Sequence, residues 1–141
     1  MRGDTMYEEA ELIEKAHQAM ENAYCRYSGF MVGAALLCDD GTVYTGCNVE
    51  NASYGASNCA ERTAIFKAVS DGHKDFKAIA ICGGKSLDDT VVCQPCGICR
   101  QVMSEFCDTS FEIVLGSYKA GKLAFTRKFL LDELLPFAFE L

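Results

Sequence analysis

The chain has 141 residues, of which half are apolar and 23% are charged, and its formal net charge is −7. This length and apolar content predict one domain over residues 1–141. The negative charge disfavours a nucleic-acid partner, because phosphates require a basic footprint, and it disfavours an anionic membrane surface. A neutral small molecule is the kind of partner that this charge does not penalise.

Residues 1–10 (MRGDTMYEEA) contain no apolar run after a basic start, so we expect no export signal. No stretch approaches the roughly 18 apolar residues that a membrane-spanning helix requires. We therefore expect a cytoplasmic protein whose nine cysteines stay reduced. Clustered cysteines in such a compartment are more often metal ligands than disulfide partners.

Hydrophobic periodicity and turn residues divide the chain into alternating helices and strands. Thr5 and Glu8 fit a capping box at the first helix start, and Pro95 fits the first position of a later helix. In chain order we expect a helix at 5–23, strands at 31–37 and 42–49, a loop at 51–57, a helix at 59–69, a strand at 76–82, a loop at 83–89, an extended piece at 91–92, a helix from 95 to about 106, strands at 111–115 and 122–126, and a helix at 129–135. This alternation predicts an α/β fold built as a three-layer sandwich.

Three cysteines lie at predicted helix starts, where the positive end of the helix dipole favours thiolates. Cys96 and Cys99 share one helix face, with Cβ atoms roughly 5–6 Å apart, and Cys59 begins an earlier helix. Zn–S bonds of about 2.3 Å in tetrahedral geometry put two sulfurs about 3.8 Å apart, which such thiols can match. Three ligands with one open position are typical of a catalytic zinc site.

Two charged residues follow Cys59 closely. Glu61 is the candidate proton carrier, because at the helix start its carboxylate can reach towards the metal. The structural alternative is that Glu61 forms a capping box with Asn58. The nearby cysteines favour the catalytic role of Glu61 over this alternative. Arg62, next to the ligand turn, is the candidate compensator for the charge of three thiolates.

Cys93 extends the cysteine run to Cys93-x-x-Cys96-x-x-Cys99, so a fourth sulfur could close the site. A closed site with four cysteine ligands would indicate a non-catalytic zinc module. An iron–sulfur cluster has the same spacing, although Met103 stands where its next cysteine would be. Pro95 places Cys93 outside the ligand helix, so we interpret Cys93 as a spectator thiol.

Cys59-Ala60-Glu61 and Pro95-Cys96-Gly97-Ile98-Cys99 match the zinc deaminase pattern, in which a His or Cys ligand precedes a catalytic Glu by two residues and Pro-Cys-x-x-Cys follows. Cysteine as the first ligand resembles the small, homotetrameric cytidine deaminases. Other stretches are similar to the same family: YSGFMVGAAL at 27–36, GCNVENASYG at 46–55, CRQ at 99–101, EF at 105–106 and LLPFAF at 134–139. The resemblance covers nearly the whole chain and implies the cytidine deaminase-like fold with a mixed five-stranded sheet.

The resemblance also implies the activity, which is hydrolytic deamination of cytidine and 2′-deoxycytidine to uridine and 2′-deoxyuridine, with release of ammonia, in pyrimidine salvage. One zinc ion per chain and a homotetramer with active sites completed by neighbouring subunits belong to this expectation. The implied roles are zinc binding by Cys59, Cys96 and Cys99, proton transfer by Glu61, charge moderation by Arg62, ribose binding by Asn48 and Glu50, substrate contacts by Phe30 and Ala60, and insertion of Phe139 into a neighbour's pocket.

Two other enzyme classes share the zinc pattern. A deaminase of a cytosine-containing antibiotic such as blasticidin S would keep the same cysteines, although Asn48 and Glu50 favour a nucleoside. Polynucleotide editing is disfavoured by the acidic balance and the short chain. Phe137 and the pair Cys25-Arg26 depart from the family pattern, which leaves the pocket shape open.

Overall fold

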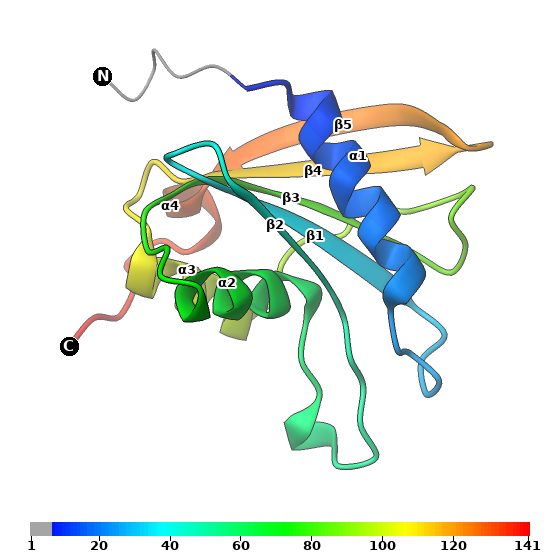
Figure 1. Cartoon of the computed structure of the whole chain (residues 1–141), viewed down its shortest axis with the longest axis horizontal. Coiled ribbons are helices and arrows are strands. Elements are labelled where there is room, and N and C mark those ends of the chain that lie inside the picture. Colours follow the sequence, from blue (N-terminus) through cyan, green and yellow to red (C-terminus); the bar gives the residue numbers. More distant parts are fainter. Residues whose placement is uncertain (1–6) are drawn as a thin grey trace.

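A five-stranded sheet forms the middle layer of the protein, in the strand order β2-β1-β3-β4-β5. The structure is a computed structural model that describes residues 7–141, so Thr5 of the expected capping box lies outside the described part. Helix α1 crosses one face of the sheet, and α2, α3 and α4 cover the other (Figure 1). The expected three-layer α/β/α sandwich is confirmed.

The elements follow the expected order. They are α1 (Glu9–Ala19), the 3₁₀ turn η2 (Met20–Asn22), β1 (Met31–Cys38), β2 (Val43–Cys47), the 3₁₀ turn η3 (Tyr54–Ala56), α2 (Ala60–Ser70), β3 (Phe76–Gly84), α3 (Gly97–Phe106), β4 (Glu112–Lys119), β5 (Lys122–Leu130) and α4 (Leu131–Leu134). Within the described residues, none of the helices is both long and apolar enough to cross a membrane.

The sheet is mixed, as expected. Strand β1 pairs antiparallel with β2 and with β3, and β4 pairs antiparallel with β5. Strands β3 and β4 are parallel, with Ala78 opposite Glu112 and Ile81 opposite Leu115. A parallel pair needs a crossover connection, and the connection here contains α3.

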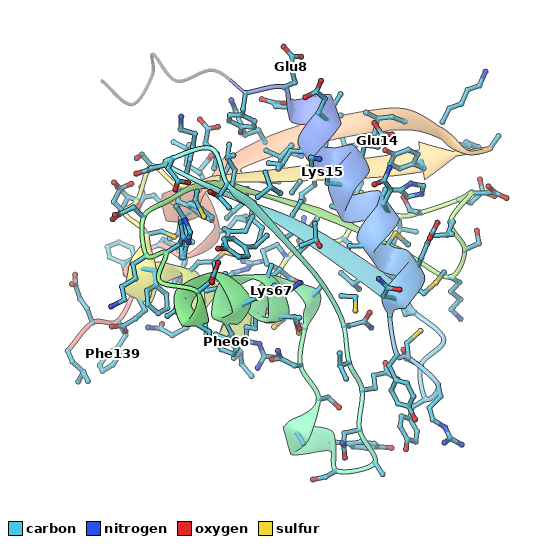
Figure 2. The ribbon with its side chains drawn as sticks, in the orientation of Figure 1. Glu8, Glu14, Lys15, Phe66, Lys67 and Phe139 are labelled. Carbon is cyan, nitrogen blue, oxygen red and sulfur yellow. The ribbon has the colours of Figure 1, made fainter. Side chains whose placement is uncertain are left out.

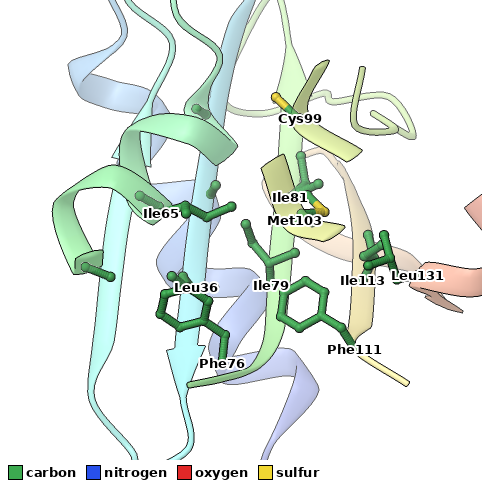
Figure 3. Close-up of a cluster of buried hydrophobic side chains, with 14 of the residues drawn as sticks. Leu36, Ile65, Phe76, Ile79, Ile81, Cys99, Met103, Phe111, Ile113 and Leu131 are labelled. Carbon is green, nitrogen blue, oxygen red and sulfur yellow. The ribbon is translucent and has the colours of Figure 1, made fainter. Parts of the chain in front are cut away.

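Alternation along the strands builds two cores, because successive side chains of a strand point to opposite faces. Leu36, Ile79 and Ile81 pack towards α2 and α3, together with Ile65 and Met103 of those helices (Figure 3). The opposite face carries mostly small side chains, which contact α1. The residues that it buries in the strands are Ala35, Leu37, Ala78, Ala80, Cys82, Val114 and Tyr118.

Small residues let α1 approach the sheet closely. A Cβ atom added at Gly33 of β1 would lie 1.9 Å from the carbonyl oxygen of Ala16 in α1. A Cβ atom at Gly116 of β4 would lie 2.4 Å from Ile13 Cγ2. The distance between α1 and the sheet therefore depends on glycine at both positions.

Two predicted helix starts are wrong. The first helix begins at Glu9, and Glu8 is its N-cap without a side-chain cap hydrogen bond. The helix expected from residue 95 begins at Gly97, because Cys96 has an extended conformation (φ −70°, ψ 168°) and is the N-cap. Pro95 therefore lies before the helix.

The C-terminal boundaries also differ from those expected. Strand β5 continues past residue 126 because it keeps pairing with β4 as far as Leu130, which lies opposite Glu112. The last helix is consequently only Leu131–Leu134.

Gly33→Ala should destabilise the protein by about 2 kcal/mol or more, because the added methyl group meets backbone atoms of α1 that cannot rotate away. The measurement is the urea unfolding midpoint. Gly55→Ala is the matched control, since a Cβ atom there meets nothing within 4 Å. Equal midpoints for the two variants would contradict the close packing of α1.

Candidate active site

Two helix N-termini converge on one point and bring three cysteines together. Cys59 is the N-cap of α2, Cys96 is the N-cap of α3, and Cys99 lies in the first turn of α3. Cys59 and Cys96 both have extended backbones, which turn the chain into the helix that follows. Figure 3 shows Cys99 at the end of α3, beside the core.

The three sulfurs fit a tetrahedral metal ion. The Sγ atom of Cys96 lies 3.6 Å from that of Cys59 and 3.5 Å from that of Cys99. All three Sγ atoms lie within 4.8 Å of one another. These separations approach the roughly 3.8 Å expected between two thiolates on zinc.

The charge of the cluster favours a bound cation. Hydrogen bonds from Cys99 and from Arg62 lower the pKa of Cys59 to about 5, against the effect of burial. The hydrogen bond with Cys59 and burial raise the pKa of Cys99. One sulfur therefore gains its charge at the expense of its neighbour, and a divalent ion removes this conflict because all three can then be thiolates.

Arg62 adds a positive charge to the cluster. Its Nη2 donates a hydrogen bond to Cys59 Sγ at 3.3 Å. Its Nε is buried and has no hydrogen-bond partner among the described residues. The guanidinium therefore contacts one of the three clustered sulfurs directly.

Glu61 is a buried carboxylate in the first turn of α2, with 3% of its surface exposed. Burial raises the pKa of Glu61 to about 7. The alternative capping box is absent, because Cys59 is the N-cap and the amide of Asn58 donates instead to Thr63 Oγ1 at 3.1 Å. The Glu61 carboxylate bonds instead to its own backbone N–H and to Cys99, which places it against the cysteine cluster.

Cys93 stands apart from the metal cluster. Among the described residues, only Cys59, Cys96 and Cys99 meet the distance criterion for a metal-binding group. A Cβ atom added at Gly83 of β3 would lie 2.9 Å from Cys93 Sγ, so this thiol packs on the sheet. The closed site with four cysteine ligands is therefore not formed.

A cavity of about 460 Å³ opens beside the cluster. This volume is in the range of small-molecule sites. The residues lining it come from β1, the loop that follows β2, the start of α2, the loop before α3 and the start of α3. They are Val32, Asn48, Glu50, Tyr54, Gly55, Ser57, Asn58, Cys59, Ala60, Glu61, Arg62, Cys93, Gln94, Cys96 and Ile98.

Asn48 and Glu50 lie in the segment that follows β2, and both line the cavity. The Asn48 amide bridges two backbone groups, because its Nδ2 donates to Phe30 O and its Oδ1 accepts from Val32 N, each at 2.8 Å. The Glu50 carboxylate accepts hydrogen bonds from Tyr27 and Ser28. Both side chains are therefore held in place before any ligand enters.

Two expected substrate residues lie outside this lining. Phe30 is half-buried, and its Cε1 would lie 3.0 Å from a Cβ atom added at Gly83. Phe139 is 67% exposed on the segment after α4 (Figure 2), where its carbonyl oxygen accepts a hydrogen bond from Gln101 at 3.1 Å. Ala60, by contrast, is fully buried and lines the cavity.

Sequence reasoning missed Ser28 and Asn58 as parts of this region. Asn58 pairs with Val49 through two backbone hydrogen bonds of 2.9 Å, which join the segment of Asn48 and Glu50 to the start of α2. Ser28 contacts Glu50, 22 residues away. Gly29, whose positive φ of 69° marks the turn that holds Ser28, was a local signal.

Comparisons with known proteins agree with this geometry. Residues 6–115 match the family model described as the cytidine and deoxycytidylate deaminase zinc-binding region, and this range includes the three clustered cysteines and Glu61. A cytidine deaminase of Sporosarcina psychrophila is 50% identical over 129 residues, which are 92% of this chain and 89% of that protein. A blasticidin-S deaminase of Bacillus cereus is 30% identical over 133 residues, or 92% of this chain and 90% of that one.

The fold agrees with solved structures as well. The crystal structure of a cytidine deaminase from Burkholderia pseudomallei has a TM-score of 0.81 at 48% identity and covers 95% of this chain and 100% of that chain. The cysteines that the two helix starts bring together are the zinc site of this family. The chain belongs to the zinc-dependent cytidine deaminase family.

Proposed function

We propose that this protein hydrolyses the exocyclic amine of cytidine and 2′-deoxycytidine, with Glu61 as the proton carrier. The observation that carries the proposal is a buried carboxylate beside three clustered thiols in a cavity of nucleoside size. In the reaction, water adds to C4 of the base, the bond between C4 and the amine nitrogen breaks, and uridine or 2′-deoxyuridine and ammonia are formed. This reaction belongs to pyrimidine salvage.

Zinc held by the three cysteines supplies a Lewis acid that makes water nucleophilic near neutral pH. Glu61 accepts one proton from the attacking water and passes it to ring N3, and it then accepts the second proton from the new hydroxyl at C4 and passes it to the departing amine. A single carboxylate can perform both transfers when it is within hydrogen-bond reach of the water and of the base. The low exposure of Glu61 supports this role, because bulk water does not compete for its protons. Arg62 limits the negative charge that the three thiolates bring.

Asn48 and Glu50 are proposed to bind the sugar hydroxyls. Both line the cavity, and each has hydrogen-bonding capacity left after its hydrogen bonds within the protein. Ala60 borders the cavity beside Cys59 and is proposed to contact the base. Phe30 directly precedes β1, and its carbonyl oxygen accepts a hydrogen bond from Asn48. We propose that its ring packs on the substrate.

A blasticidin S deaminase is the alternative within the same family, since such a relative is 30% identical to this chain. Relatives named cytidine deaminase reach 50% identity over a similar length. The two functions are separated by kcat/KM for cytidine and for blasticidin S. We expect the larger value for cytidine.

We also propose a homotetramer in which Phe139 completes a neighbour's active site. Exposed apolar side chains on α2, α3 and the C-terminal segment support an interface, because monomers rarely expose large apolar patches. Phe66, Ile98 and Phe139 are 47%, 62% and 67% exposed. Figure 2 labels Phe66 and Phe139. The cytoplasmic location stays a prediction from the sequence.

Glu61→Gln should retain one zinc ion per chain and lose roughly 100-fold or more in kcat for cytidine, because the amide cannot transfer protons. Zinc is measured by elemental analysis and turnover by the loss of cytidine absorbance. Glu14→Gln, on the exposed side of α1, is the matched control and should keep wild-type kcat. Turnover near wild type in Glu61→Gln would remove this residue from the mechanism.

Phe139→Ala should lower kcat/KM roughly tenfold, since a buried aromatic contact between subunits is lost. Co-purified tetramers of Phe139→Ala and Glu61→Gln chains should regain activity, because a site with intact Glu61 then receives Phe139 from the other chain. Phe125→Ala, an exposed phenylalanine on β5, is the control. Mixed tetramers no more active than the average of the two parents would rule out a contribution from the neighbour.

A further inference from the structure

A turn at Tyr27 and Ser28 surrounds the Glu50 carboxylate with donors. The backbone N–H groups of Tyr27 and Ser28 donate to Oε1 at 3.0 and 3.1 Å, and the Ser28 hydroxyl donates to Oε2 at 2.5 Å. The hydroxyl hydrogen bond is the main cause that holds the pKa of Glu50 below its usual range, so the side chain stays a carboxylate. A carboxylate has about four acceptor positions, so three donors leave capacity for one more.

The Ser28 hydroxyl acts in two directions. Besides donating to Glu50, its oxygen accepts the N–H of Phe30 at 3.0 Å. The Phe30 carbonyl in turn accepts from Asn48 at 2.8 Å. Ser28 and Asn48 thus fix the N–H and the carbonyl group of Phe30. Asn48 and Glu50, the two proposed sugar-binding residues, are therefore joined through one hydrogen-bonded frame, which consists of Ser28, Phe30, Asn48 and Glu50.

Backbone pairing joins this frame to the metal end of the cavity. Glu50 N donates to Tyr24 O at 2.8 Å, and Tyr24 N donates to Asn48 O at 3.0 Å. On the other side, Val49 exchanges two hydrogen bonds with Asn58, the neighbour of Cys59. The Asn48–Glu50 segment is therefore fixed relative to the start of α2, and the freedom that remains to Glu50 is that of its side chain.

We infer that Ser28 is a positioning residue that orients the Glu50 carboxylate towards the sugar hydroxyls of the nucleoside. The inference rests on the proposed role of Glu50 in sugar binding. Ser28 itself is not among the residues that line the cavity, so it acts through Glu50. A glutamate side chain that is free to rotate loses conformational entropy when it binds a ligand, and this loss lowers affinity. A carboxylate that is already oriented avoids this entropy loss.

Ser28→Ala should raise the KM for cytidine about 5-fold, as expected for one hydrogen bond, and change kcat by less than about 2-fold. The inhibition constant of 2′,3′-dideoxycytidine, measured in competition with cytidine, should change much less, because this ligand lacks the hydroxyls that Glu50 binds. Ser28→Thr keeps the hydroxyl and should restore the KM for cytidine. A merely structural role of Ser28 would affect both ligands equally.

Two further variants make the outcome unambiguous. Ser86→Ala is the matched control, because the Ser86 hydroxyl also bonds within an exposed turn, with Asp89, outside the cavity. Glu50→Gln, measured in parallel, tests the proposed role of Glu50 itself. Selective loss of cytidine affinity in both Glu50→Gln and Ser28→Ala supports the inference.

Four results would overturn it. Selective loss in Glu50→Gln with a wild-type KM in Ser28→Ala removes Ser28 and leaves the role of Glu50 intact. Equal weakening of both ligands in Ser28→Ala, or no restoration in Ser28→Thr, reduces Ser28 to a structural residue. Unchanged selectivity in Glu50→Gln removes both the role of Glu50 and the inference built on it.

Discussion

The convergence of three cysteine sulfurs on one point is the constraint on which the site depends. The two helix N-termini direct Cys59, Cys96 and Cys99 to one point, and their sulfurs lie within 4.8 Å of one another. The positive ends of two helix dipoles and the Arg62 guanidinium favour thiolates here, but the hydrogen bond with Cys59 and burial raise the pKa of Cys99, so all three sulfurs become thiolates together only on a cation. Zinc binding and the local fold are therefore coupled, because the same ion that balances the charge joins α2 to α3.

The sheet determines where the two helices can begin. Parallel pairing of β3 with β4 requires a crossover, and α3 lies in that crossover with Cys99 and Met103 buried against the sheet. On the other face, glycine and alanine positions allow α1 to lie close to the sheet. One end of the cavity is proposed to hold the sugar, and the other lies at the metal cluster. The β-bridge between Val49 and Asn58 connects these two ends, so hydrogen-bonded backbone borders the cavity. This rigidity suits a site that must hold a base within reach of one carboxylate.

Much of this arrangement could be predicted from the sequence, because its signals are local. Helix starts, strand alternation and the spacing of Cys96 and Cys99 depend on neighbours a few residues apart. The errors arose where a distant partner decides the outcome: β5 runs to Leu130 because β4 continues beside it, and Ser28 matters because Glu50 lies 22 residues further along the chain. The capping position of Cys96 was missed for a local reason, since Pro95 is compatible both with the first helical position and with the residue before a cap.

The coordination of zinc tests the account most directly, because the proposed chemistry needs three sulfur ligands and one position open to water. X-ray absorption at the zinc edge of the purified protein distinguishes the alternatives by ligand type and bond length. The account predicts three sulfurs at about 2.3 Å and one oxygen at about 2.0 to 2.2 Å. Four sulfurs at about 2.3 Å, with zinc lost in Cys93→Ser, would identify a closed structural site and contradict it.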